Sequence, residues 1–342
     1  MTLVNNDFFN DKRDTAEIVL FGIFFQKILR NIDAVAMVTD QRGYIKFTSE
    51  KFLSYFDLNP KKVLGENWVD VIIPEGKKRA ADELFSVLKE DEKLVQFDIS
   101  VVRVGNHKSR LLWTASPLVN RDAEKMFFFI GMETKDPFNK ETGKKVVGAK
   151  EANKIRGEVA RLFFEASEKC DPATAKHALR SMFFAERLAR EIGLSAKKIE
   201  NLKTASLLHD LGKLAVDPGV LFKKGKLTQG EFAHVKKHLV WGADLLRRMY
   251  FLKDIVAIMC SHHENYDGRG YPDGISGENI PLEARILSVA DIYEALTADR
   301  PYRDAFSTEE AIAIMEYEKG HKLDPQLTDV FLAMIRKEGR SV

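Results

Sequence analysis

An adjacent histidine and aspartate, His209 and Asp210, are the first residues of the chain whose types suggest chemistry. They end an apolar stretch over residues 205–208. Lys213 follows four positions after His209, on the same face if the helix continues. An imidazole next to a carboxylate can bridge and chelate two metal ions. A His-Asp pair alone is more often a surface feature, so this pair needs independent support.

Two consecutive histidines, His262 and His263, are a stronger signal. They follow the apolar run 255–260, and imidazoles are uncommon at the end of a core helix without a function. The chain has two cysteines and no Cys-x-x-Cys pair, so any metal must be held by histidines and carboxylates. That donor set suits iron, manganese or zinc, and a metal site becomes the leading interpretation.

The segments that position these side chains have a helical pattern. Apolar residues recur at three- and four-residue steps from about residue 150, with stop signals at Gly193, at Pro218 and in the glycine-rich loop 267–277. The clearest expected helices cover residues 174–192, 197–209, 228–250, 254–261, 282–298 and 308–318. The sequence therefore predicts an all-α second half.

The first half has a β pattern instead. Residues 34–40 and 44–49 are β-prone runs joined by a turn signal, and three more such runs follow a helical middle, at 94–104, 108–117 and 125–134. This order predicts a small α+β domain. Seven of the eight histidines come after residue 170, so we expect the chemistry in the second half.

Composition limits the function classes. A length of 342 residues favours two domains, and 45% hydrophobic with 30% charged residues excludes a disordered or fibrous chain. A net charge of +2 gives no reason to expect long nucleic acid as a partner. The most apolar run, 18–25, is too short for a membrane span, and no signal peptide is recognised. With few cysteines, the chain reads as cytoplasmic.

The hairpin, short helices and three-stranded meander over about residues 28–135 resemble a PAS sensor domain. The likeness rests on the strand 34–40, the Gly43 turn and the segment 130–134. The resemblance implies a sensory domain whose ligand is unknown. Because this segment has no cysteine for a flavin adduct, an empty or metabolite-binding domain is favoured over a haem or flavin domain.

The run His262-His263-Glu264-x-x-Asp267-Gly268-x-Gly270-Tyr271-Pro272 resembles the signature of the HD-GYP family of cyclic di-GMP phosphodiesterases. The match also includes residues 209–213, 280–287 and 300–303, and it covers about residues 150–342. The resemblance implies two divalent ions, iron or manganese rather than zinc, with Asp210 bridging them. The implied metal ligands are His177, His209, Asp210, His238, His262, His263 and Asp291.

The resemblance also implies catalytic and substrate-binding residues. Asp210 and Lys213 would be catalytic, Lys213 by neutralising phosphate charge or protonating the leaving oxygen. The implied substrate-binding residues are Lys213, Asp267, Gly270, Tyr271, Arg300 and Arg303. Solvated or loop-tying roles stay open for several of them, Asp267 in particular.

One position departs from the pattern of three-metal family members, which carry a glutamate four residues before the first ligating histidine. Here that position is Ala173, so we predict a binuclear centre, with Glu168 or Asp171 as alternative third-metal ligands. His234 and His321 are expected to be peripheral.

The expected organisation is an N-terminal helix (1–27), a PAS-like α+β sensor domain (28–135), a linker and connecting helix (136–165) and an all-α HD-type catalytic domain (166–342). The expected function is metal-dependent hydrolysis of cyclic di-GMP, to pGpG or GMP, regulated by the sensor. We also expect a homodimer through the N-terminal and linker helices, and a diguanylate cyclase or other signalling protein is a candidate partner. The alternatives are a catalytically silent dinucleotide receptor or interaction module, and a hydrolase of another cyclic dinucleotide or nucleotide.

Overall fold

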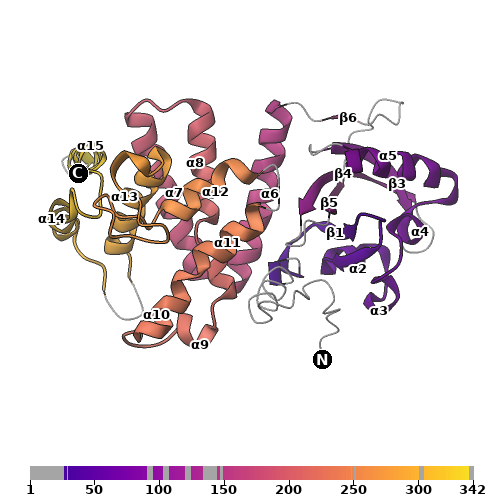
Figure 1. The fold of residues 1–342 in the computed structure, drawn as a ribbon, viewed down its shortest axis with the longest axis horizontal. Helices are drawn as coiled ribbons and strands as arrows, with labels where there is room; N and C mark the ends of the chain where they lie inside the picture. Colours follow the sequence, from indigo (N-terminus) through magenta and orange to yellow (C-terminus); the bar gives the residue numbers. More distant parts are fainter. Residues whose placement is uncertain are drawn as a thin grey trace. The chain divides into compact units, whose positions relative to one another are not determined.

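A computed structural model gives the fold of the chain (Figure 1). It describes residues 27–28, 30–90, 95–102, 108–119, 125–133, 145–146, 149–247, 249, 252–299 and 304–338. The helix expected before residue 27, the linker around 136–143, and Arg300 and Arg303 lie outside these residues. Contacts divide the chain into two units, Met1–Cys170 with Leu245–Lys253, and Asp171–Asp244 with Asp254–Val342. The domain boundaries drawn from the sequence stay a prediction.

The N-terminal unit is built on an antiparallel sheet whose described strands lie in the order β2-β1-β5-β4-β3-β6. The strands are β1 (Val35–Asp40), β2 (Ile45–Thr48), β3 (Val95–Val102), β4 (Lys108–Val119), β5 (Lys125–Glu133) and β6 (Lys145–Val146). The expected hairpin is β1–β2, and the expected meander is β3–β4–β5, with β5 returning to pair with β1. The short strand β6 extends the sheet beyond what the sequence pattern indicated.

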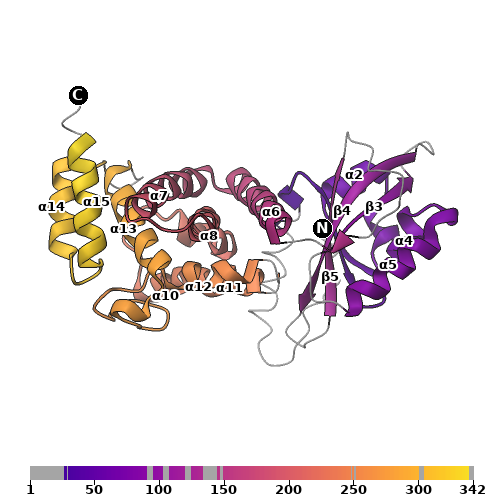
Figure 2. The same ribbon diagram turned by 90° about the horizontal axis from the view of Figure 1, so that it is seen from above.

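Short helices lie along one face of this sheet (Figure 2). They are α2 (Glu50–Phe56), α3 (Pro60–Val63), α4 (Trp68–Ile72) and α5 (Lys78–Glu90). Alternate strand residues point to this face, so Phe127 and Phe129 of β5 pack against Phe85 and Trp68, with ring centroids 5.1 Å (Phe85–Phe127) and 5.4 Å (Trp68–Phe129) apart. The aromatic core confirms the expected α+β domain.

All elements after β6 in the described residues are helical, as the spacing predicted. The α-helices are α6 (Ala149–Cys170), α7 (Pro172–Glu191), α8 (Ala196–Leu208), α9 (Pro218–Leu221), α10 (Gln229–Lys236), α11 (His238–Arg247), α12 (Lys253–Ser261), α13 (Leu282–Thr297), α14 (Thr308–Glu318) and α15 (Pro325–Glu338). A 3-10 turn, η4 (Leu211–Ala215), follows α8, and η6 (Gly277–Asn279) precedes α13. Among the described residues, no helix is both long and apolar enough to span a lipid bilayer.

The structure divides the single helix expected over 228–250. Helix α10 ends at Lys236, the Lys237 N–H bonds to the His234 carbonyl in a tight turn, and α11 begins at His238. Apolar periodicity continues through this point, so the pattern alone does not reveal the break. The break places His238 in the first turn of a helix, with its ring turned into the protein interior.

Candidate metal centre

The His209–Asp210 pair lies where α8 gives way to the 3-10 turn η4. Helix α8 does not continue as an α-helix, so Lys213 pairs with Asp210 rather than with His209. The Lys213 N–H bonds to the Asp210 carbonyl at 2.8 Å, and Lys213 Nζ lies 2.6 Å from Asp210 Oδ2. Side chains three apart are aligned in a 3-10 turn. The tighter turn therefore brings the ammonium to the carboxylate.

A close backbone approach fixes this turn against α11. A Cβ on Gly212 would lie 1.9 Å from the His238 carbonyl oxygen and 2.8 Å from the Gly242 nitrogen. Only glycine fits at such a distance. Gly212 therefore allows the segment that carries Asp210 to rest directly on the helix that carries His238.

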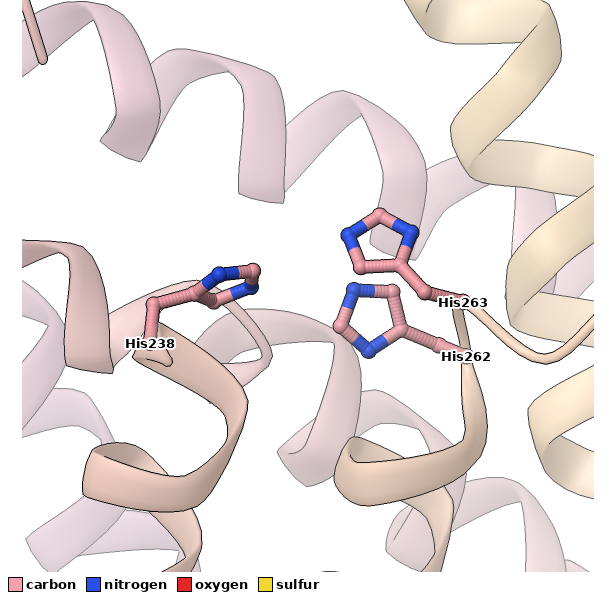
Figure 3. A group of neighbouring side chains, drawn as sticks. All are labelled: His238, His262 and His263. Atoms are coloured by element: carbon pink, nitrogen blue, oxygen red, sulfur yellow. The ribbon is translucent and has the colours of Figure 1, made fainter. Parts of the chain in front are cut away.

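The predicted metal ligands are brought together from five segments. Three overlapping groups have donor atoms within 4.8 Å of one another: His238 with His262 and His263, His177 with His209 and Asp291, and His209 with Asp210 and His262. Figure 3 shows the first group, with rings from α11 and from the end of α12 facing each other. All seven residues that the sequence pointed to are therefore neighbours.

Asp210 lies at the middle of this cluster and is 3% exposed. Its Oδ2 is 3.4 Å from His209 Nε2 and 3.8 Å from His177 Nε2, while its Oδ1 is 3.3 Å from His238 Nε2. The two carboxylate oxygens thus face different histidines. A carboxylate placed in this way can bridge two ions.

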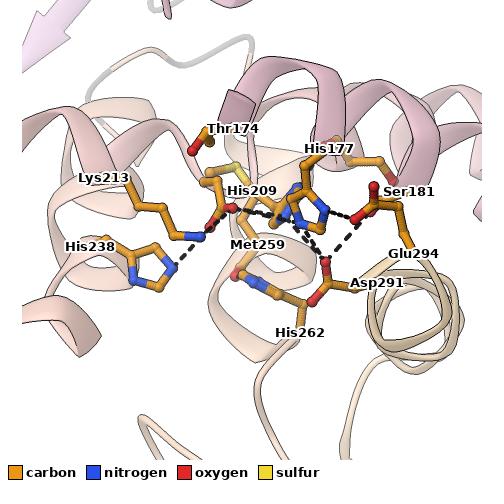
Figure 4. A network of polar contacts seen from close by, with 12 residues as sticks. Thr174, His177, Ser181, His209, Lys213, His238, Met259, His262, Asp291 and Glu294 are labelled. Carbon is orange, nitrogen blue, oxygen red and sulfur yellow. Dashed lines mark hydrogen bonds and ion pairs between the residues drawn. The ribbon is translucent and has the colours of Figure 1, made fainter. Parts of the chain in front are cut away.

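Four of the histidines use Nδ1 for a protein contact, which leaves Nε2 for a metal. His209, His238 and His262 contact the carbonyl oxygens of Ser206, Val235 and Met259 at 2.7, 2.8 and 2.6 Å. His177 Nδ1 instead contacts the Glu294 carboxylate, and its Nε2 lies 2.7 Å from Asp291 Oδ1 (Figure 4). Such partners fix the tautomer and the ring orientation of metal-binding histidines.

The residues fit divalent metal ions because several buried donor atoms make no hydrogen bond within the part of the chain that the structure describes. The Nε2 atoms of His209, His238 and His262 and the Oδ1 atom of Asp210 are buried without a hydrogen bond to any described residue. Buried polar atoms are rarely left unpaired, since the loss of hydration is costly. Four such atoms converging on one place are explained by metal ligation.

Burial sets the charge state of most of these imidazoles. It lowers the pKa of His238 to about 3 and that of His263 to about 4, and it holds the pKa of His262 well below the usual range. All three are therefore neutral at neutral pH, which is the form that ligates metals.

The pKa values of His177 and Asp210 are set by charged neighbours, whose effect outweighs burial. Burial alone lowers the pKa of His177, but the charge and hydrogen bond of Asp291 outweigh it and raise the value to about 9. For Asp210, burial raises the pKa, while the neighbouring Lys213 and His209 more than offset that effect and keep the carboxylate ionised. At neutral pH the centre therefore combines an ionised Asp210 and a protonated His177 with the three neutral imidazoles, so a metal ion that bound His177 would displace its proton.

Neither alternative third-metal ligand belongs to the clusters found among the described residues. Asp171 caps helix α7, accepting hydrogen bonds from the Thr174 N–H at 3.1 Å and from the Thr174 hydroxyl at 2.7 Å. Glu168 lies on the preceding helix, α6. Ala173 carries no donor, so within the described residues neither position 173 nor these two carboxylates adds a ligand to the clusters.

A buried glutamate, Glu264, holds the loop after His263. It belongs to the signature run in the sequence, but no role was predicted for it. Glu264 is 2% exposed, and its Oε1 accepts hydrogen bonds from the N–H groups of Asp273 and Gly274 at 2.7 and 3.1 Å. A Cβ on Gly270 would lie 2.2 Å from the Asn265 nitrogen. Glu264 and Gly270 thus fold the loop tightly onto the end of α12.

The predicted substrate-binding residues on this loop have distinct positions. The Tyr271 ring packs against His263, with centroids 5.0 Å apart. Asp267 accepts a hydrogen bond from the Arg269 N–H at 3.0 Å, and its own N–H bonds to the His321 carbonyl. Its carboxylate therefore ties the loop to itself, which is the alternative to substrate binding that the sequence left open for Asp267. Arg300 and Arg303 lie outside the described residues, and the imidazole of His321 is exposed.

The sequence reading missed two polar residues that support the centre. Glu294 is 2% exposed and lies three positions after Asp291 on α13, so its i+3 spacing was the available signal. Ser181, four positions after His177, approaches Asp291 Oδ1 at 3.5 Å.

Comparison with known protein families divides the chain into a first and a second part, as the β and helical patterns of the sequence do. Residues 162–327 match the family described as HD domain, and residues 23–134 match the PAS fold. The chain thus carries a PAS domain followed by an HD domain.

Several curated proteins resemble about half of the chain. It is 40% identical over 169 residues to the cyclic di-GMP phosphodiesterase response regulator RpfG of Xanthomonas campestris, covering 49% of this chain and 45% of that protein. It is 38% identical over 189 residues to cyclic di-GMP phosphodiesterase PA4108 of Pseudomonas aeruginosa, with coverages of 55% and 45%. It is 37% identical over 164 residues to the 3'3'-cGAMP-specific phosphodiesterase 2 of Vibrio cholerae, with coverages of 46% and 31%. The chain spans less than half the length of each relative.

Proposed function

We propose that this protein is a metal-dependent phosphodiesterase that hydrolyses cyclic di-GMP to pGpG or GMP in bacterial second-messenger signalling. The observation that carries the proposal is the buried Asp210 carboxylate, whose two oxygens face different histidines within one cluster of donors. Relatives named as cyclic di-GMP phosphodiesterases support the choice of substrate.

In this proposal Asp210 would be shared by two ions, iron or manganese. One ion would be held by His177, His209, Asp210 and Asp291, and the other by Asp210, His238, His262 and His263. Two bound divalent ions supply Lewis-acid activation of an attacking water and neutralisation of phosphate charge. His209, His238 and His262 lie at helix ends, and backbone carbonyls already orient their rings, so little reorganisation of these three would accompany ion binding.

The remaining residues act on the substrate. Lys213, partly exposed and beside Asp210, is placed to neutralise charge on the phosphate and to donate a proton to the leaving oxygen. Gly270 lets the loop backbone lie close to the centre, and Tyr271 forms part of its wall. Arg300 and Arg303 are proposed as further phosphate or guanine contacts, and Asp267 as the residue that holds the loop.

We further propose that the PAS domain regulates hydrolysis, that the protein is cytoplasmic, and that it dimerises through the N-terminal and connecting helices. The domain boundaries expected from sequence, 1–27, 28–135, 136–165 and 166–342, are part of this proposal. Deletion of residues 1–135 should change turnover without changing metal content, and unchanged kinetics would argue against coupling.

A second substrate class has a specific observation in its favour. One relative is named as specific for 3'3'-cGAMP, and its 37% identity to this chain is close to the 40% and 38% of the two relatives named for cyclic di-GMP. Because the metal-binding residues can be shared by both activities, only the groups that read the bases separate them. A silent receptor is the third alternative, and the complete donor set counts against it.

The test is a substrate panel on the anaerobically purified protein. Cyclic di-GMP, 3'3'-cGAMP and cyclic di-AMP are each supplied with iron and with manganese, and Asp210→Asn is the control. We expect cyclic di-GMP to be turned over fastest and the variant to be inactive. Faster turnover of 3'3'-cGAMP would reassign the substrate, and tight binding without turnover would support a receptor.

A further inference from the structure

An aromatic and cationic cluster adjoins the metal centre without belonging to it. Helix α10 contributes Phe232 and Lys236, and the loop after α12 contributes Tyr271. The Phe232 and Tyr271 rings are 6.5 Å apart at 79°, and Lys236 Nζ lies 5.2 Å from each ring centroid. We call these three residues the aromatic corner.

The aromatic corner lies beside the more open part of the centre. Tyr271 packs on His263, which is half-buried, whereas His209, His238 and His262 are each 1% exposed. Phe232 is 48% exposed, so much of its ring area is available to a ligand. A molecule that reached the ions past His263 would pass this corner.

The contacts of Lys236 indicate what kind of ligand the aromatic corner can bind. Among the described residues, no carboxylate forms an ion pair with it, and its contacts are the two rings. Its neighbour Lys223 shows the usual arrangement, with Nζ 2.8 and 2.7 Å from the two carboxylate oxygens of Glu231. An ammonium held over aromatic rings without an anion has donors left for a ligand.

We propose that Phe232 and Lys236 form a base-recognition subsite that holds one guanine of the cyclic dinucleotide. This inference rests on the proposed function and deepens it. The exposed face of Phe232 stacks on the base, as aromatic side chains do for bases of any sequence. Lys236 donates hydrogen bonds to O6 and N7 of guanine. Adenine presents an amino group in place of O6, so the same lysine disfavours it.

The two side chains therefore have separable effects. Removal of the Phe232 ring weakens binding of guanine and adenine dinucleotides alike, by about 5- to 150-fold for one stacked base. Replacement of Lys236 by methionine keeps an apolar side chain over the rings and removes the donors. That change lowers the preference for guanine over adenine by about tenfold.

The experiment measures binding by calorimetry on the metal-loaded full-length protein. The probes are the non-hydrolysable bisphosphorothioate analogues of cyclic di-GMP and cyclic di-AMP. The variants are Phe232→Ala and Lys236→Met, with metal content measured for each. Phe183→Ala is the matched control, because Phe183 is an equally exposed phenylalanine on α7 with Arg187 5.3 Å from its ring centroid.

We expect Phe232→Ala to weaken both analogues, Lys236→Met to reduce the guanine preference, and Phe183→Ala to change neither. Wild-type affinity in Phe232→Ala, or an equal loss in Phe183→Ala, would overturn the proposal. Hydrolysis of cyclic di-GMP by the wild-type protein is measured in parallel. Turnover with no effect of the variants refutes the subsite alone, whereas analogue binding that depends on Phe232 without turnover refutes only the proposed activity.

Discussion

The contact between Glu294 and His177 predicts that one of the two ions depends on a residue that touches neither. Four histidines make a contact through Nδ1. For His177 the partner is a carboxylate, whereas for the other three it is a backbone carbonyl. Glu294 is buried, and its other oxygen lies 3.6 Å from Arg180 Nε. The carboxylate therefore both orients the ring and makes Nε2 a better donor.

The size of the effect follows from what each substitution removes. Glu294→Gln keeps an oxygen that accepts from Nδ1 and loses the charge, whereas Glu294→Ala also frees the ring to rotate. Loss of such a partner weakens metal binding by about 10- to 100-fold. We expect the glutamine variant near the lower value and the alanine variant near the upper one.

The assay is a competition titration of Mn²⁺ against a chromogenic chelator, which resolves two binding steps. One step should weaken, since His177 groups with His209 and Asp291, while the step that involves His238 and His263 stays unchanged. Glu283→Gln is the control, because Glu283 lies on the same helix and pairs with the surface residue Lys198 at 3.3 Å. Two unchanged steps in Glu294→Ala would refute the reasoning.

Three further predictions concern packing, metal number and stability. Gly212→Ala should lower the free energy of unfolding in urea by about 1–3 kcal/mol. Gly157→Ala in α6, where a Cβ meets nothing within 4 Å, should instead raise it by about 0.5–1 kcal/mol. A stable Gly212→Ala protein would contradict the close approach to His238. Asp171→Ala should cost about 0.5–2 kcal/mol as a lost cap, and Asp171→Asn should cost little. Elemental analysis should find two metals per chain in both Asp171 variants. Loss of an ion relative to the wild-type protein would show that Asp171 ligates a third metal. Dialysis against a chelator should lower the stability of the helical domain by about 3 kcal/mol for each ion otherwise held at about a hundred times its Kd. Calorimetry measures this, and an unchanged melting curve would argue against metal binding in the core.

The fold classes and the adjacent pairs His209–Asp210 and His262–His263 could be predicted from sequence because they leave local signals. The ligand roles of His177, His238 and Asp291 were implied only by the family resemblance. Period-two runs in the first half became β1 to β5, and three- and four-residue spacing in the second half became helices. His262 and His263 follow an apolar helix, which is an unusual place for two imidazoles. These features depend on residues close together in the chain.

What could not be predicted depends on tertiary contacts. The apolar pattern runs through Lys237, so it hides the break that frees His238 to begin α11. The 3-10 turn after α8, which pairs Lys213 with Asp210, likewise follows from packing of Gly212 on α11. Glu294 looks like an ordinary helix residue until α7 brings His177 beside it.

We propose that hydrolysis depends on two ions shared by Asp210, and the dependence of activity on metal loading is the decisive measurement. The protein is stripped of metal and reloaded in steps with Mn²⁺, and metal content and cyclic di-GMP hydrolysis are measured on each sample. We expect activity that appears as loading approaches two ions per chain, and none in a folded Asp210→Asn variant. Hydrolysis by the stripped protein, or wild-type turnover in the variant, would contradict it.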